Sequence, residues 1–439
     1  MYEPSLERAS LEQIRKIQAN ALRRYLVAVS ARIPNYADKI VAAGLSDPYT
    51  VEDAELFAIF SSLPLMDGKD YVAIDYAALV ATDRALYYLE STSGTTSAPK
   101  SRYVTVADDS LDQQLMARSL SAFGLKVSDR LLTVDLGDLN FHSLVVKGLS
   151  KLGIRDSIFY SLRKPFARAF ADALSCNPSV LMTIPSILMR SMPDLELSLR
   201  KTPSLNKLVY YCEPLDISFE RYLYREFGIE SFSLYSSIET GLIGAECSAH
   251  DGLHVWLDAL FIDLAEKVTP AKHDFTQHDG VTEGSLAITT LSHLGKPTLR
   301  YLLGDRVQYT QAPCLCGRTL PRLRFVERDT DNFSIYGTKF SFRQVYQYIY
   351  NEEDVSNFLQ IVVSENQDST TLTFVLPETI NSSKNRKKER LYKQLGSQPG
   401  FAFLLDHNVL NIDLRFVESE YFTRRKIKRV TDKRNPLNT

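Results

Sequence analysis

The fold and function of this chain are best inferred from one polar stretch, Ser91-Thr92-Ser93-Gly94-Thr95-Thr96-Ser97-Ala98-Pro99-Lys100. It follows the apolar run Leu86-Tyr87-Tyr88-Leu89, which predicts the end of a buried strand. Five of its first six residues are Ser or Thr and the other is Gly, so the loop offers a polyphosphate backbone N–H groups, small hydroxyls and one ammonium group. It is not the Gly-x4-Gly-Lys-Ser/Thr loop, because its Lys follows a Pro. The alternative is a polar surface loop.

Composition sets the broad class of the protein. The chain has 439 residues, 44% hydrophobic and 24% charged, which is typical of a soluble globular protein with more than one core. A formal net charge of -2 gives no reason to expect a nucleic-acid partner. No signal peptide is evident, no apolar run is long enough to span a bilayer, and five cysteines are too few for a disulfide framework. We therefore expect a cytoplasmic protein with no membrane and no nucleic acid among its partners.

Strands and helices alternate through the larger, N-terminal part of the chain. One amphipathic helical stripe runs through residues 5–33, and Pro34 is expected to end it. Segments 107–124 and 144–152 also have helical periodicity. Apolar runs that predict strands lie at 130–134, 157–161, 179–183 and 207–212. This alternation predicts a layered α/β sheet, and the ends of its strands are the usual place for a ligand.

The C-terminal part of the chain has a different pattern. We expect helices at 342–350 and 384–395 and strands at 358–363, 370–376 and 412–417. Together these elements predict a small, helix-backed antiparallel sheet. The Lys and Arg residues of 384–393 form either a solvated helix face or a surface for an acidic carrier protein or CoA phosphates.

Several strings resemble motifs of the acyl-adenylate-forming enzymes. The loop at Ser91 is similar to their phosphate loop, Thr-Ser-Gly-Thr-Thr-Gly-x-Pro-Lys, except that Ser97 replaces a Gly that could take a positive φ without strain. Tyr235-Ser236-Ser237-Ile238-Glu239 resembles Tyr-Gly-x-Thr-Glu, and Arg300-Tyr301-Leu302-Leu303-Gly304-Asp305 resembles Arg-Tyr-x-x-Gly-Asp. The opening helix followed by Ile33-Pro34-Asn35-Tyr36 is similar to the phenylacetate–CoA ligase branch of this superfamily.

The resemblance implies an α/β fold with two domains. The large N-terminal layered α/β adenylation domain would span residues 1–327, and a small mobile C-terminal α+β lid domain would span residues 328–439. Residues 326–333 resemble the segment that joins these domains in the family, which implies a hinge near 328–331. Thr330 replaces the family's hinge carboxylate there, although Asp331 is retained.

The resemblance also assigns residues to ATP and Mg²⁺. Asp305 would accept hydrogen bonds from both ribose hydroxyls, since a carboxylate is a suitable acceptor for a vicinal diol. Glu239 would hold Mg²⁺, which needs few carboxylates where phosphate oxygens complete its coordination. Tyr211 and Cys212 stand where the family has small residues just before the Glu-Pro turn beside adenine. The other implied ATP-binding residues are Ser93, Gly94, Thr95, Thr96, Lys100, Glu213, Pro214, Tyr235, Ser236 and Arg328.

The basic string 421–430 resembles the family's closing Gly-Lys-x-x-Arg-Val. This match makes Lys426 the catalytic lysine, with Arg425 in place of the Gly, and Lys428 is the alternative. An ammonium group there would neutralise the negative charge that develops as the acid attacks the α-phosphate.

Three of the five cysteines lie in two segments that also resemble stretches of phenylacetate–CoA ligase-like proteins. Cys247 precedes His254, and Cys314 and Cys316 form a Cys-x-Cys-Gly turn. Thiolates and a neutral imidazole at such turns suit tetrahedral zinc, and a site with four protein ligands would be structural. His250 is an alternative ligand to His254, and three free buried thiols are the alternative to a metal site.

The activity that the resemblance implies is ATP-dependent activation of an aromatic or small organic acid to an acyl-adenylate, with release of pyrophosphate. CoA or a carrier protein would then accept the acyl group, and the chain could form a homodimer. Phe141 and His142 stand where the family often borders its acyl pocket. The favoured alternative for His142 is an ordinary surface or core histidine. One alternative is an adenylating enzyme with an amine acceptor. The other is a non-catalytic nucleotide-binding homologue, which Ser97, Thr330 and Arg425 would favour.

Overall fold

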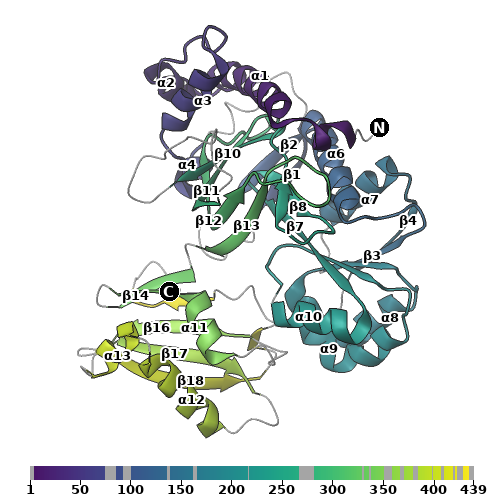
Figure 1. Ribbon diagram of the computed structural model, residues 1–439, viewed down its shortest axis with the longest axis vertical. Coiled ribbons are helices and arrows are strands. Elements are labelled where there is room, and N and C mark those ends of the chain that lie inside the picture. Colours follow the sequence, from purple (N-terminus) through teal and green to yellow (C-terminus); the bar gives the residue numbers. More distant parts are fainter. Residues whose placement is uncertain are drawn as a thin grey trace. The chain divides into compact units, whose positions relative to one another are not determined.

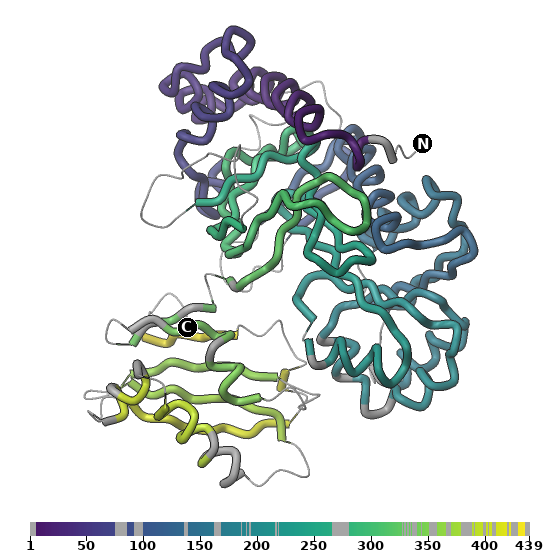
Figure 2. The backbone as a smooth tube through the Cα atoms, viewed as in Figure 1, coloured from purple at the N-terminus to yellow at the C-terminus, as the bar shows by residue number. Residues whose placement is uncertain are grey.

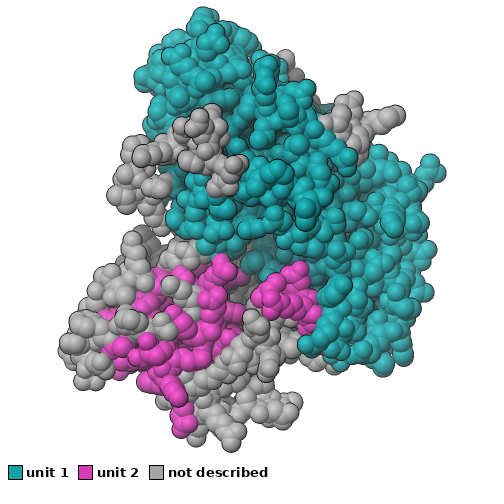
Figure 3. Space-filling model, viewed as in Figure 1, with its two compact units in different colours: residues 1–215, 223–326 teal, residues 216–222, 327–439 magenta. Residues whose placement is uncertain are grey.

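The computed structural model describes residues 4–74, 86–91, 100–135, 139–161, 166–215, 217–265, 281–328, 331–335, 338–350, 358–365, 370–378, 384–397, 399–406, 410–418, 421–422 and 429–434. The chain divides into two compact units, which Figure 3 shows in teal and magenta. Unit 1 comprises Met1–Leu215 and Leu223–Val326, and unit 2 comprises Asp216–Tyr222 and Glu327–Thr439. The division after Val326 lies next to the domain end expected at residue 327. The hinge near 328–331 stays a prediction.

An 11-stranded sheet is the centre of unit 1, with the strand order β10-β11-β12-β13-β9-β8-β7-β6-β5-β3-β4. Five of its strands are parallel neighbours, which confirms the predicted layered α/β fold. They are β3 (Arg130–Asp135), β4 (Asp156–Ser161), β5 (Val180–Thr183), β6 (Lys207–Tyr210) and β7 (Glu230–Ser237). α6 (Val106–Ala122) precedes β3. The helices that follow strands of this half are α7 (Leu139–Lys151), α8 (Phe166–Leu174), α9 (Pro185–Arg200) and α10 (Ile217–Phe227).

The other half of the sheet contains antiparallel pairs. Its strands are β8 (Gly241–Glu246), β9 (Leu253–Val255), β10 (Leu260–Ala265), β11 (Thr282–Thr290), β12 (Tyr301–Thr310) and β13 (Arg322–Arg328). Helices from the start of the chain share a core with this half, which includes Phe261, Leu291 and Tyr301. Figures 1 and 2 show these purple helices beside the green strands. They are α1 (Leu11–Ser30), α2 (Pro34–Ala42), α3 (Asp53–Ser62) and α4 (Gly68–Val72), after the short 3-10 helix η1 (Pro4–Arg8).

The prediction of one helix through residues 5–33 that Pro34 ends is wrong at both ends. Ser10 caps α1 by accepting a hydrogen bond from the backbone of Gln13, so α1 starts only at Leu11. Pro34 begins the next helix, because the first position of a helix needs no N–H donor and suits the fixed φ of proline. No helix among the described residues has both the length and the apolar character needed to cross a bilayer.

The strand expected to be buried before the phosphate loop is instead exposed. Among the described strands, β1 (Leu86–Ser91) pairs with β2 (Ser101–Thr105) alone, in a two-stranded antiparallel sheet outside the 11-stranded sheet. Leu86, Tyr87 and Leu89 are exposed. The register pairs Ser91 with Ser101, and this pairing brings together the two ends of the segment that carries the predicted phosphate loop.

Unit 2 has its own hydrophobic core around a four-stranded sheet of order β18-β17-β16-β19. The predicted antiparallel sheet is wrong in part, since β17 pairs with β18 in parallel and β16 pairs with β19 in parallel. α12 (Lys384–Gly396) and α13 (Pro399–Asp406) connect β17 (Thr370–Pro377) to β18 (Leu410–Val417), and a crossover of this length permits parallel pairing. Figure 1 shows β16, β17 and β18 side by side. The remaining elements are β14 (Asn332–Ile335), β15 (Thr338–Ser341), α11 (Phe342–Ile349), β16 (Gln360–Glu365) and β19 (Val430–Asp432).

Candidate functional site

Lys100, Glu239 and Tyr301 form a compact polar cluster in unit 1. The Lys100 ammonium donates to Glu239 Oε1 at 2.7 Å and to the Tyr301 hydroxyl at 2.7 Å, and this hydroxyl donates to Glu239 Oε1 at 2.8 Å. Burial raises the pKa of Glu239, but the hydrogen bond and charge of Lys100, followed by the hydrogen bond from Tyr301, lower it below its usual value. The cluster therefore holds a carboxylate anion next to a cation at the end of the predicted phosphate loop.

The local structure explains why these three side chains meet. Glu239 lies in the turn between β7 and β8, Tyr301 is the first residue of β12, and Lys100 immediately precedes β2. The Arg300 carbonyl accepts a hydrogen bond from Met66 N at 3.0 Å, and Leu302 N donates to the Met66 carbonyl at 2.8 Å. These two bonds fix the backbone on either side of Tyr301, and therefore the direction of its ring.

A second pair of expected nucleotide-binding residues also meets. The Tyr235 hydroxyl donates to Asp305 Oδ2 at 2.5 Å, and Asp305 is buried. Tyr235 lies near the end of β7, and Asp305 follows Gly304, whose φ of +79° lies in the left-handed region that glycine adopts without strain. Ser236 is half-buried next to Tyr235 and pairs with Leu242 across β7 and β8.

The turn at Tyr211 lies at the carboxyl end of β6, where ligands usually bind in open α/β sheets. Cys212 has a φ of +69°, so the backbone keeps a conformation that favours glycine although a larger residue stands there. The Tyr211 ring lies 4.4 Å from that of Phe141, and its hydroxyl donates to Asp135 at the end of β3. Glu213 and Pro214 continue the same turn.

His142 lies next to Phe141 in the first turn of α7. Its ring is 4.6 Å from the ring of Phe159, and burial lowers the pKa of His142 below its usual value. The buried Nδ1 atom has no hydrogen-bond partner among the described residues. The imidazole is therefore a neutral group with one unused polar atom.

Some expected site residues cannot be compared with the structure. Arg328 is the last residue of β13, is exposed and belongs to unit 2. The residues that lie outside the described part of the chain are Ser93, Gly94, Thr95, Thr96, Ser97, Thr330, Arg425, Lys426 and Lys428.

The four expected zinc ligands come together in unit 1. One donor atom from each of Cys247, His254, Cys314 and Cys316 lies within 4.8 Å of the others. Sγ of Cys247 is 3.7 Å from Sγ of Cys314, and Nε2 of His254 is 3.3 Å from Sγ of Cys316. Metal bonds of about 2.3 Å to sulfur and about 2.0 Å to nitrogen would give tetrahedral edges of roughly this length. The donor set therefore fits tetrahedral zinc.

The surroundings of His254 also suit a metal ligand. Nδ1 of His254 lies 2.9 Å from the Leu320 carbonyl, to which it can only donate, so Nε2 presents its lone pair toward the cysteines. Burial lowers the pKa of His254 to about 4, and the ring is therefore neutral. His250, the alternative ligand, contacts Glu230 at 3.0 Å and Glu246 at 3.4 Å instead. The hydrogen bond to Glu246 is the largest effect that raises the pKa of His250 to about 9, so this ring is a cation.

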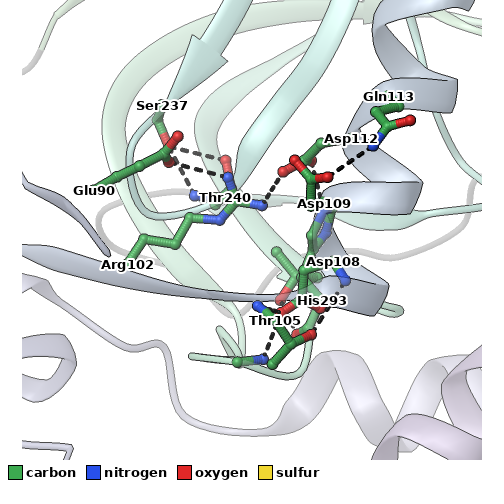
Figure 4. A network of polar contacts seen from close by, with 12 residues as sticks. Glu90, Arg102, Thr105, Asp108, Asp109, Asp112, Gln113, Ser237, Thr240 and His293 are labelled. Atoms are coloured by element: carbon green, nitrogen blue, oxygen red, sulfur yellow. Dashed lines mark hydrogen bonds and ion pairs between the residues drawn. The ribbon is translucent and has the colours of Figure 1, made fainter. Parts of the chain in front are cut away.

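Sequence reasoning missed a buried charge network that supports the Glu239 turn (Figure 4). Arg102 in β2 donates to Asp112 at 2.7 Å and to Glu90 at 3.2 Å, and Nε2 of His293 contacts the other oxygen of Asp112 at 2.7 Å. A side chain at Gly241 would lie 3.0 to 3.2 Å from the Arg102 guanidinium. The guanidinium thus packs directly against the turn that carries Glu239. No motif marks these residues, because they are scattered along the sequence.

The same network fixes the loop between β11 and β12. Asp108 in α6 accepts hydrogen bonds from the backbone of Leu294 and Gly295 at 3.0 Å each, as well as from Thr105 N at 2.9 Å. A Cβ atom at Gly295 would lie 2.1 Å from the Tyr103 carbonyl, so only glycine fits there. β2, α6 and the segment that leads into Tyr301 are therefore joined behind the polar cluster.

Asp112→Asn should lower the free energy of unfolding at pH 7 by roughly 3 to 5 kcal/mol, because the buried Arg102 guanidinium loses the counter-charge of Asp112. Burial raises the pKa of Asp112, but Arg102 and then His293 lower it to about 2 in the folded state, from an ordinary value of 3.8. The stabilisation of the folded state by ionised Asp112 is therefore complete well above pH 3.8 and is lost as the pH falls toward 2. Urea unfolding between pH 7 and pH 3 should show the difference from wild type shrinking at acid pH.

Asp156→Asn is the matched control, because Asp156 pairs with Arg130 at 2.7 Å in an exposed position. It should cost less than about 1 kcal/mol. An equal loss in the two variants, or a difference for Asp112→Asn that does not change with pH, would contradict the role given to the network.

Comparisons with known proteins agree with the geometry. No family model matches the chain. The chain is 26% identical to phenylacetate–coenzyme A ligase of Thermus thermophilus over 76% of its length and 74% of that protein. It is 24% identical to phenylacetate–coenzyme A ligase of Escherichia coli, with 89% of each chain covered.

Solved structures give the same result for the fold. 2-Hydroxyisobutyryl-CoA ligase in the postadenylation state with 2-HIB-AMP matches 99% of this chain and 92% of its own, at a TM-score of 0.76 and 18% identity. The anthranilate CoA ligase AuaEII with anthranoyl-AMP matches 76% of this chain and 63% of its own, at a TM-score of 0.53 and 14% identity. These comparisons confirm the resemblance read from the sequence: the chain has the fold of the acyl-adenylate-forming enzymes and is phenylacetate–CoA ligase-like in sequence over most of its length.

Proposed function

We propose that this chain is an AMP-forming acid–thiol ligase, which activates a carboxylic acid with ATP and transfers the acyl group to CoA. The observation that carries the proposal is the Lys100–Glu239–Tyr301 cluster, together with the Tyr235–Asp305 pair, in a chain similar to phenylacetate–CoA ligases. The names of the similar proteins are those of CoA ligases, and two of the structures hold an acyl-AMP. These names favour a thiol acceptor over an amine. They also favour a catalytic protein over a non-catalytic homologue.

The nucleotide would use both groups of residues. Tyr235 would pack on adenine beside the Glu213-Pro214 turn, and Asp305 would accept hydrogen bonds from the ribose hydroxyls. Ser93, Gly94, Thr95, Thr96, Ser236 and Lys100 would contact the phosphates, and Arg328 would reach ribose and phosphate. Lys100 would move from the Glu239 carboxylate to a phosphate oxygen of ATP, because the triphosphate carries more negative charge than one carboxylate.

Glu239 fits a magnesium ligand. Two hydrogen bonds from the described residues reach Glu239, and both are accepted by Oε1. Oε2 would therefore be the oxygen that binds the cation, and the lowered pKa of Glu239 keeps the group ionised. Mg²⁺ bound there would neutralise the phosphate charge and help to position the triphosphate. One protein carboxylate suffices, because phosphate oxygens and waters supply the other ligands.

The reaction has two steps. A carboxylate oxygen of the acid attacks the α-phosphorus of ATP, the bond from that phosphorus to the bridging oxygen breaks, and pyrophosphate leaves with the electron pair. Lys426 would neutralise the charge on the acid and on the bridging oxygen, as fixed charges do most effectively in the transition state. The deprotonated sulfur of CoA then attacks the carbonyl carbon, the thioester forms, and AMP leaves with the anhydride oxygen.

Zinc would have a structural role in this enzyme. The four donor atoms of Cys247, His254, Cys314 and Cys316 leave no position for a substrate. Bound zinc would connect the loop after β8, strand β9 and the turn before β13, so metal binding would stabilise unit 1. Glu239 is not among the ligands of this cluster, and the zinc would take no part in the transfer of the acyl group.

Lys426→Ala should lower the rate of acid-dependent pyrophosphate release by a factor of about 10² to 10³, because the transition state loses a fixed positive charge. Lys428→Ala is the matched control and should retain most of the wild-type rate. The measurement is pyrophosphate release with ATP, Mg²⁺ and a panel of acids, with and without CoA. A larger loss in Lys428→Ala would give the catalytic role to Lys428, and full activity in both variants would remove the lysine from the mechanism.

The purified protein should contain about one zinc ion per chain, as four thiolate and imidazole donors require. Cys314→Ser should lose this zinc and lower the free energy of unfolding. Cys176→Ser should retain the metal, since Cys176 is not a member of the cluster. Elemental analysis and urea unfolding with and without a chelator measure the two effects. A wild-type protein free of metal, and indifferent to added zinc, would contradict the site.

A further inference from the structure

Tyr211 is a large buried side chain next to Phe141, where the acid is expected to bind. Tyr211 is 4% exposed. Its hydroxyl donates a hydrogen bond to the Asp135 carboxylate, and Asp135 is 5% exposed. Its ring contacts Phe141, which is expected to border the acid pocket, at a centroid distance of 4.4 Å. Tyr211 therefore adjoins any acid group that reaches Phe141.

Two features hold the Tyr211 ring in this place. The hydrogen bond to Asp135 connects the carboxyl end of β6 to that of β3, and moving the ring would take a donor from a buried carboxylate. The ring also belongs to the main core cluster of unit 1, against which Phe141, Ile184 and Tyr235 pack. Close packing leaves a buried aromatic ring little freedom to make room for another ring of the same size.

The backbone conformation next to Tyr211 is a second observation, after the packing of its ring, that indicates a ligand-binding role for this turn. Cys212, the next residue, has a φ of +69°. A non-glycine residue in this region is strained, and such strain is concentrated at ligand-binding turns. The chain has thus kept a glycine-like turn while it carries a phenol ring on the preceding residue.

We propose that Tyr211 closes the far end of the acid pocket and that the substrate is a short aliphatic monocarboxylic acid, not an aryl acid. This inference rests on the proposed function. A phenyl group next to Phe141 would compete with the Tyr211 ring for the same volume. A second carboxylate on the acid would be repelled by Asp135, so dicarboxylic acids are also disfavoured.

The test is kcat/KM for pyrophosphate release with acetate, propionate, isobutyrate, succinate, benzoate and phenylacetate. Wild type should use the best short monocarboxylic acid at least tenfold better than either aryl acid. Tyr211→Ala should raise kcat/KM for phenylacetate at least tenfold and lower it for the short acids, because the space left by the ring fits a phenyl group.

Two variants separate pocket shape from loss of stability. Tyr211→Phe keeps the ring and should keep the preference for short acids. Tyr309→Ala removes a tyrosine of equal exposure, 4%, from the same core cluster, and should lower stability without changing the order of the acids. If Tyr211→Ala does not fold, Tyr211→Leu, which leaves a smaller space, should raise the relative use of benzoate and phenylacetate.

The outcomes are distinct. A wild-type preference for phenylacetate or benzoate would overturn the inference and leave the proposed function intact. A folded Tyr211→Ala or Tyr211→Leu with the wild-type order of acids would also overturn it, since Tyr211 would then be a core residue only. Absence of pyrophosphate release with every acid, in wild type and variants, would refute the proposed function and this inference with it.

Discussion

The ion pair between Lys100 and Glu239 is the interaction on which the candidate site depends. It holds two opposite charges together where the chain is expected to bind a triphosphate and its metal ion. In the free protein each charge satisfies the other, and Tyr301 adds a hydrogen bond to the same carboxylate oxygen. In the proposed function, a nucleotide with Mg²⁺ would offer both groups a partner of higher charge, so binding would exchange one set of contacts for another without leaving a buried charge unpaired.

This exchange requires a rigid support, which the Arg102 network provides. Arg102 in β2 donates a hydrogen bond to Asp112 in α6, and Asp112 in turn contacts His293 in the loop before β12. The guanidinium also packs against Gly241, next to the turn that contains Glu239. Buried ion pairs of this kind contribute little net stability relative to apolar packing. Their value here is geometric, because the neighbouring elements β2 and α6 are fixed to two segments far along the chain, the loop before β12 and the turn next to Gly241.

The sequence predicted the strands of the parallel half of the large sheet because alternating apolar runs and helices follow directly from backbone periodicity. It also predicted that Cys247, His254, Cys314 and Cys316 lie together, since thiols and imidazole at paired turns are a strong chemical pattern, and the structure brings those four residues together. It failed for Leu86 to Leu89, whose apolar character does not reveal that β1 pairs with β2 alone among the described strands. It failed for the pairing of β17 with β18, which depends on the path of two helices. The contact of Tyr301 with Glu239, and that of Tyr211 with Asp135, join residues more than sixty positions apart, and no local pattern encodes them.

In the proposed reaction, an attacking carboxylate cleaves ATP between its α- and β-phosphates. The most direct measurement is the identity of the nucleotide product, separated by anion-exchange chromatography after incubation with ATP, Mg²⁺, CoA and a mixture of short and aryl acids. AMP and acyl-CoA should form in equal amounts, and only when acid is present. ADP and inorganic phosphate as the products, or AMP formed at the same rate without any acid, would contradict it.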